Sequence, residues 1–110
     1  VPLIAPGVRL TKELSNRGIR TNVTLVFTVG QALLAAKAGA TYISNFVGRV
    51  DDLSTDGMIA VRDTVNMINE YGYESEVLVA SVRHPKHVLE AIQAGGHVAT
   101  MPLKVIEALF

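Results

Sequence analysis

Four short runs rich in β-branched and aromatic residues recur along the chain, and segments with helical spacing separate them. Each run has about 5 to 7 residues, which suits a strand better than a helix. Strands separated by helices need crossover connections, and such strands pair in parallel. The predicted strands cover residues 21–27, 41–47, 76–81 and 97–101.

The helices are predicted from apolar spacing and from the proline and glycine residues near their ends. The clearest covers residues 57–71, where apolar side chains follow each other at steps of three and four and form one stripe. Gly72 then supplies the left-handed residue that commonly ends a helix. The other predicted helices cover residues 6–17, 31–38, 85–94 and 102–110.

This order predicts an α/β fold with a parallel sheet, in which the strands are apolar on both faces, as strands covered by helices should be. Two architectures fit: a small, open, doubly wound sheet, and part of a (β/α)₈ TIM barrel. A whole barrel takes ~250 residues, so four βα units in 110 residues are close to a half-barrel. Length alone does not separate the two, and residues 1–110 are expected to form a single unit.

Composition excludes several classes of protein. The chain is 49% hydrophobic and 18% charged, which is too apolar for a disordered chain. Its formal net charge is zero, so we expect no nucleic acid or anionic membrane as partner. It has no cysteine and no apolar run of about 18 residues. We expect a cytoplasmic protein that has lost its beginning, because the first residue is Val1 rather than methionine.

Small polar residues gather along the predicted strands. Asn22 and Thr24 are two residues apart and share one face, and Ser44 and Phe46 do the same on the next strand. Inward-pointing polar groups are costly in a buried sheet unless they meet partners. A shared polar pocket and a set of satisfied core hydroxyls explain these residues equally well.

Two arginines and a serine lie at the carboxyl ends of neighbouring strands, where parallel α/β folds place their active residues. Arg49, Ser81 and Arg83 would form a phosphate site, because arginine offers a planar donor fork to an oxyanion. The alternative is a pair of ordinary surface arginines. His84 and His87 have the spacing of a helical metal pair, but no third ligand is nearby in sequence, so no metal is expected.

Five segments, spread over all four predicted strands, resemble the small transaldolases and fructose-6-phosphate aldolases, and the resemblance runs from the first residue to the last. These segments are residues 21–27, 31–40, 46–52, 79–83 and 101–106. The resemblance implies a (β/α)₈ barrel of which this chain is the C-terminal half, with barrel strands five to eight. It implies a reaction without metal or organic cofactor, in which a lysine forms a Schiff base and a dihydroxyacetone unit passes between sugar phosphates.

The resemblance also implies roles for individual residues. Asn22 would hydrogen-bond substrate hydroxyls, Thr24 would position the water that transfers protons, and Ser44 would line the pocket. Phe46 favours the transaldolases, because the aldolases carry a tyrosine there, and Asn22 favours them too. The remaining positions form the group expected to bind the substrate phosphate: Arg49, Ser81 and Arg83.

The resemblance places the Schiff-base lysine directly before Val1, so the nucleophile is absent and the chain alone is expected to be inactive. We expect the lysines that the chain does contain to lie on helices and to face solvent. The partners implied are sugar phosphates, the N-terminal half of the barrel and further copies in a homo-oligomer. Alternatives are a non-catalytic half-barrel that self-associates, a fructose-6-phosphate aldolase, and a stand-alone phosphate-binding α/β domain. The lysines are Lys12, Lys37, Lys86 and Lys104.

Overall fold

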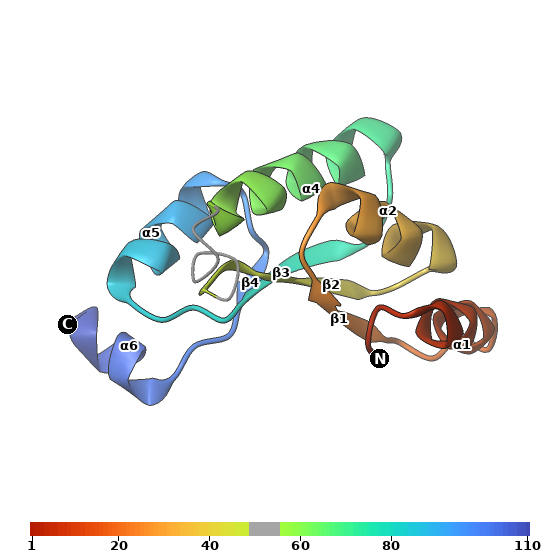
Figure 1. Ribbon diagram of the computed structural model, residues 1–110, viewed down its shortest axis with the longest axis horizontal. Coiled ribbons are helices and arrows are strands. Elements are labelled where there is room, and N and C mark those ends of the chain that lie inside the picture. Colours follow the sequence, from red (N-terminus) through yellow and green to blue (C-terminus); the bar gives the residue numbers. More distant parts are fainter. Residues whose placement is uncertain (49–55) are drawn as a thin grey trace.

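The computed structural model describes residues 1–48 and 56–110, and strands and helices alternate along the chain (Figure 1). The predicted order of elements is confirmed. The strands are β1 (Asn22–Val26), β2 (Tyr42–Phe46), β3 (Glu76–Ala80) and β4 (Val98–Ala99). The helices are α1 (Ala5–Asn16), α2 (Val29–Ala38), α4 (Gly57–Tyr71), α5 (Pro85–Gln93) and α6 (Leu103–Ala108).

All neighbouring strands are parallel, and their order in the sheet is their order in the chain, β1-β2-β3-β4. The first residues of the chain continue this order on the other edge of β1. Pro2 forms a parallel bridge with Thr24, whose N–H donates to the carbonyl oxygen of Val1 at 2.8 Å. The N–H of Leu3 donates to the carbonyl oxygen of Thr24 at 3.0 Å. Residues 1–3 therefore lie where a preceding parallel strand would end.

One face of the sheet packs on helices and forms the hydrophobic core. Helix α2 contacts β1 and β2, helix α4 contacts β2 and β3, and both helices lie on the same side of the sheet (Figure 1). Sequential parallel strands with these helices on one side are consistent with part of a TIM barrel, whereas a doubly wound sheet carries helices on both sides. The strand residues in this core are Val23, Val26, Ile43, Val77 and Val79.

The other face of the sheet is more polar than the sequence predicted. Alternation along the strands places Asn22, Tyr42, Ser44 and Glu76 on it. Asn22 and Glu76 are exposed, and Ser44 is buried. The expectation that the strands are apolar on both faces is therefore wrong at these four positions, although Leu78 and Ala80 of β3 also lie on this face. We call it the polar sheet face.

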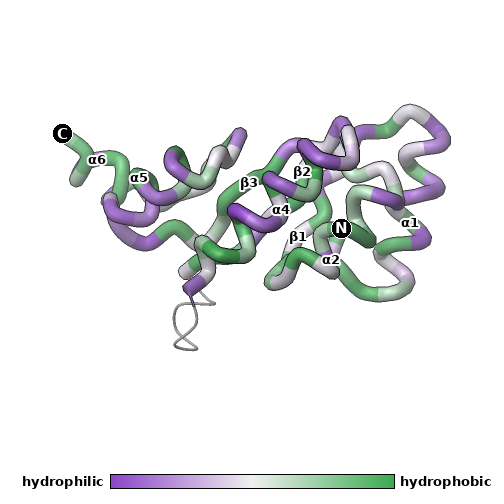
Figure 2. Tube along the Cα trace, turned by 90° about the horizontal axis from the view of Figure 1, so that it is seen from above, coloured by the Kyte–Doolittle hydropathy of each residue, from purple (hydrophilic) through white to green (hydrophobic). Residues whose placement is uncertain are grey.

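Helix α4 has the bounds predicted for it. Its stripe of Met58, Val61, Val65 and Ile68 is buried, and hydrophilic and hydrophobic segments alternate along its tube in Figure 2. Gly72 ends it in the left-handed conformation, at φ 69°. Among residues 1–48 and 56–110, no helix has the length and apolar character needed to cross a membrane.

Helix α2 begins two residues before the predicted start at Gln31, because a capping box forms there. The hydroxyl of Thr28 accepts a hydrogen bond from the N–H of Gln31 at 3.2 Å. The side-chain oxygen of Gln31 in turn accepts from the N–H groups of Thr28, at 3.2 Å, and Phe27, at 2.8 Å. These bonds satisfy donors that the first turn would otherwise leave unpaired, so the helix begins at Val29.

Candidate active site

Asn22 and Ser44 meet on the polar sheet face. The Ser44 hydroxyl donates a hydrogen bond to the side-chain oxygen of Asn22 at 2.7 Å. Ser44 is buried and Asn22 is exposed, so a buried hydroxyl holds the side chain of a solvent-accessible residue. With its oxygen engaged by Ser44, the Asn22 amide group still has two N–H donors, which suit binding of a hydroxyl oxygen.

Strand β1 is irregular where Thr24 lies. The pairing register with β2 shifts between Val23 and Val26, and Leu25 has a left-handed φ of 62°. Such bulges re-aim side chains and occur next to active sites. Thr24 is half-buried, and its main chain is fixed from the outside by residues 1–3. The run of β-branched residues gave no sign of this shift.

Two aromatic rings stand at the carboxyl ends of the first two strands. The ring of Phe46 meets that of Phe27 edge to face, with centroids 5.9 Å apart and planes at 63°. Both rings are half-buried. Phe27 thus holds the orientation of Phe46. This role was missed from the sequence, because alternation along the predicted strand 21–27 puts Phe27 on the face opposite Asn22 and Thr24, and the register shift between Val23 and Val26 was not foreseen.

A main-chain hydrogen bond joins the segments that follow the carboxyl ends of β2 and β3, and we call this contact the β2–β3 clamp. The N–H of Gly48 donates to the carbonyl oxygen of Ser81 at 3.0 Å, and Ser81 has a left-handed φ of 59°. The side chain of Arg83 lies directly over Gly48, because a Cβ added there would be 2.8 Å from the Arg83 Nε atom. A residue without a side chain is therefore needed at position 48 for Ser81 and Arg83 to take these positions.

Ser81 and Arg83 line an open pocket of about 380 Å³ between the carboxyl ends of β3 and β4. Thr100, Met101 and Pro102 form its other wall. Thr100 was placed on the fourth strand from the sequence but was not assigned to the site. Its hydroxyl adds a hydrogen-bonding group to a pocket that already holds a serine and an arginine.

The structure thus brings the predicted site residues together in two neighbouring groups. Asn22 and Ser44 are bonded to each other, and Ser81 lies beside Arg83. Phe46 pairs in register with Ala80, the last residue of β3, and Ser81 follows directly. The two groups therefore lie together at the carboxyl ends of the strands. Arg49, the third residue predicted to bind phosphate, lies outside the described residues.

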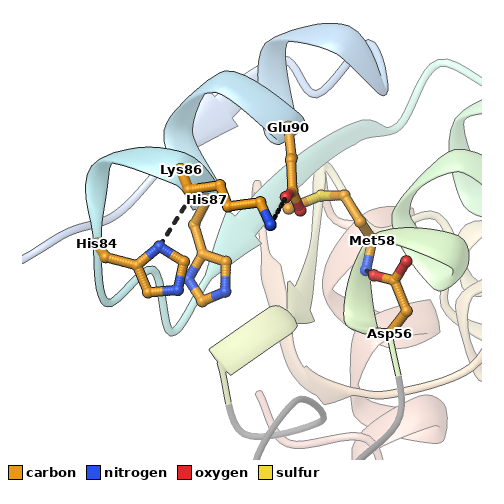
Figure 3. A network of polar contacts seen from close by, with 6 residues as sticks. All are labelled: Asp56, Met58, His84, Lys86, His87 and Glu90. Carbon is orange, nitrogen blue, oxygen red and sulfur yellow. Dashed lines mark hydrogen bonds and ion pairs between the residues drawn. The ribbon is translucent and has the colours of Figure 1, made fainter.

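His84 and His87, which have the spacing of a helical metal pair, lie together at the start of α5. The two rings stack, with centroids 3.7 Å apart. The Nδ1 atom of His84 accepts the main-chain N–H of His87 (Figure 3), and the Nδ1 atom of His87 accepts the main-chain N–H of Arg83. Within the described part of the chain, no group of three or more potential ligands could hold a metal ion. The Nδ1 atom of the third histidine, His97, accepts the N–H of Val77 at 3.0 Å.

Comparison with known proteins decides the family. The sequence model of the family described as transaldolase/fructose-6-phosphate aldolase matches residues 1–110. The chain belongs to the transaldolase/fructose-6-phosphate aldolase family. The predicted resemblance to this family is thereby confirmed.

Individual members of the transaldolase/fructose-6-phosphate aldolase family match nearly the whole chain. It is 57% identical over 109 residues to a protein from Herpetosiphon aurantiacus named probable transaldolase. It is 59% identical over 109 residues to another so named from Anaeromyxobacter sp., and 54% identical over 110 residues to one from Hydrogenobaculum sp.. The matches cover 99–100% of this chain but only 49–51% of these relatives. The chain therefore spans about half the length of the curated relatives it matches.

Proposed function

We propose that this chain is the C-terminal half of a transaldolase barrel, with β1 to β4 as barrel strands five to eight. The full-length protein would transfer a dihydroxyacetone unit between sugar phosphates through a Schiff base on a lysine directly before Val1. The observation that carries this proposal is the pairing of residues 1–3 with the outer edge of β1. That pairing is what the end of barrel strand four would make.

The position of Val1 supports the proposed place of the nucleophile. Its amino nitrogen is 2.9 Å from the carbonyl oxygen of Asn22. A residue preceding Val1 would continue along β1 beside Asn22, next to the pair that Asn22 forms with Ser44. The lysines of this chain are unsuitable, because each is exposed on a helix: Lys12, Lys37, Lys86 and Lys104.

The proposed reaction needs an amine, a positioned water and hydrogen-bond donors. The lysine amine attacks the ketone carbon of the donor sugar, water leaves, and an iminium ion forms. The hydroxyl on the next carbon then gives its proton to the positioned water, the carbon–carbon bond breaks, its electron pair moves into the iminium ion, and an aldehyde leaves. The resulting enamine attacks the acceptor aldehyde, and water then releases the product from lysine.

The described residues supply the other parts of this reaction. The Asn22 amide, oriented by Ser44, would bind a sugar hydroxyl, and Thr24 would orient the proton-transferring water. Ser81 and Arg83, together with Arg49, would bind the phosphate at the far end of the substrate. Phe46 brings no hydroxyl to the site, which favours transfer over release of the dihydroxyacetone unit by water.

We further propose that the N-terminal half of the barrel covers the polar sheet face and completes the site. A non-catalytic half-barrel that pairs with a second copy is the second candidate. Val98, 37% exposed on the outermost strand β4, favours such pairing, because an open strand edge with apolar side chains invites another strand. The mass of the native protein separates the two: a polypeptide about twice as long supports the enzyme, and a dimer of 110-residue chains supports the half-barrel.

An activity assay on the full-length protein tests the proposed reaction. With fructose 6-phosphate as donor and a four-carbon aldose phosphate as acceptor, we expect transfer of the three-carbon unit and release of glyceraldehyde 3-phosphate. Without the acceptor, steady-state release of glyceraldehyde 3-phosphate is expected to be at least about tenfold slower, since the enamine must then take up a proton from water before the enzyme can turn over again. Equal rates with and without acceptor would favour the aldolase alternative, and the separated 110-residue chain should be inactive.

A further inference from the structure

The two histidines at the start of α5 form a small structural unit with Arg83. His84 is the N-cap of α5, and its Nδ1 atom accepts a hydrogen bond from the N–H of His87 at 3.3 Å (Figure 3). The two rings stack at 3.7 Å with an angle of 29° between their planes. His87 is only 3% exposed. Histidine is an unusual N-cap, because serine, threonine, aspartate and asparagine are preferred there.

His87 bonds directly to the main chain of the predicted phosphate ligand. Its Nδ1 atom accepts a hydrogen bond from the N–H of Arg83 at 3.1 Å. Because Nδ1 is an acceptor in this bond, the proton of a neutral ring lies on Nε2. The same arrangement holds for His84, whose Nδ1 also accepts an N–H. Both rings thus use Nδ1 to fix the main chain at the end of β3 and the start of α5.

The segment 81–83 is consequently fixed at both ends. The carbonyl oxygen of Ser81 accepts the N–H of Gly48 at 3.0 Å, and the N–H of Arg83 donates to His87. Ser81, whose carbonyl oxygen makes the first of these bonds, has a left-handed conformation. Conformations of this kind persist only where the surroundings over-determine them, and they cluster at ligand sites. His87 is the buried group that holds the Arg83 end.

We propose that His87 is a positioning residue for Arg83, and that His84 supports it by stacking on its ring. By fixing the main chain of Arg83, His87 sets where the guanidinium stands over Gly48 and beside the pocket shared with Thr100. It thereby sets the affinity of that pocket for the phosphate of the substrate. This inference rests on the proposed function in one respect: the phosphate is taken to be that of a sugar phosphate.

Two substitutions of His87 in the full-length protein separate positioning from packing. H87L keeps an apolar group of related size but loses the acceptor, whereas H87N keeps an acceptor oxygen in the place of Nδ1. We expect H87L to raise KM for fructose 6-phosphate about 10-fold with kcat little changed, since small misplacements of binding groups have effects of this size or larger. H87N should recover most of that loss, and an unphosphorylated donor, fructose, should be used equally well by all forms.

A matched control and a direct binding measurement complete the test. V88A, on the next residue of α5, alters packing without touching the bond to Arg83 and should leave the preference for the phosphorylated donor unchanged. Equal losses in H87L and H87N, or equal losses for both donors, would overturn the positioning role.

Binding of inorganic phosphate, measured by calorimetry, tests the same inference independently of catalysis. We expect H87L to bind phosphate about 10-fold more weakly than the unsubstituted protein. If the two proteins differ in phosphate affinity in this way but the transfer assay fails, the proposed function is overturned and the role of His87 is not. Equal phosphate affinities, or no phosphate binding to the unsubstituted protein, would overturn the role of His87.

Discussion

Replacing Gly48 with alanine in the full-length protein is expected to cost about 3 kcal/mol of stability, the upper end for forced overpacking, and to weaken binding of phosphorylated substrate. The added Cβ would lie 2.1 Å from the carbonyl oxygen of Ser81 and 2.8 Å from Arg83 Nε. The Ser81 oxygen is a main-chain atom, so it cannot swing away as the tip of a flexible side chain can. The ends of β2 and β3 must therefore separate, and Arg83 must leave its position.

Thermal unfolding and substrate kinetics measure the two effects of G48A. We expect Tm to fall by roughly 10 °C, since each kcal/mol corresponds to about 2–4 °C in a larger domain. G30A is the matched control, because an added Cβ at Gly30 in α2 would meet only the Thr28 hydroxyl, at 3.9 Å. Alanine favours a helix over glycine, so G30A should be neutral or slightly stabilising. If G48A unfolded at the same temperature as G30A, the close approach of Ser81 and Arg83 to Gly48 in the β2–β3 clamp would be contradicted.

Replacing Arg83 with glutamine is expected to lower kcat/KM for fructose 6-phosphate by about 10- to 100-fold. A hydrogen bond to a charged group contributes about 1.5–3 kcal/mol, and each 1.4 kcal/mol is about a factor of ten. The loss should appear in KM, because the phosphate is distant from the bonds that change. R83K should be intermediate, since lysine keeps the charge but lacks the planar donor fork.

The donor without a phosphate distinguishes this effect from general damage. Fructose should be used at nearly the same rate by R83Q and by the unsubstituted protein. R62Q is the matched control, because Arg62 is also exposed but lies on α4, away from the pocket lined by Ser81 and Arg83. An equal loss for both donors, or a similar loss in R62Q, would contradict a phosphate-binding role for Arg83.

The sequence predicted the elements well where local chemistry alone decides them. The bounds of α4 follow from its apolar stripe and from Gly72, and both are local features. The start of α2 was predicted too late, because a local signal was overlooked: Thr28 is followed three residues later by Gln31, the spacing of a capping box. Strand β4 is shorter than predicted, with two residues, Val98 and Ala99, in the ladder with β3.

Site residues were predictable where strand alternation decides which face they occupy. Ser44 and Asn22 are examples, and they form a hydrogen bond on the polar sheet face. The left-handed conformations of Leu25 and Ser81 were not predictable, because the surrounding tertiary contacts impose them on residues that do not prefer them. The partnership of His87 with Arg83 was missed for a similar reason. From the sequence, His84 and His87 were considered only as a metal pair, and no metal was expected; in the folded chain the Nδ1 atoms of both histidines accept main-chain N–H groups.

Borohydride trapping tests the central claim most directly. The full-length protein is incubated with fructose 6-phosphate and reduced with borohydride, and the modified lysine is located by peptide mass mapping. We predict one reduced three-carbon unit, attached to a lysine directly before Val1. An adduct on Lys12, Lys37, Lys86 or Lys104, or no adduct at all, would contradict the proposed place of this chain in a Schiff-base transaldolase.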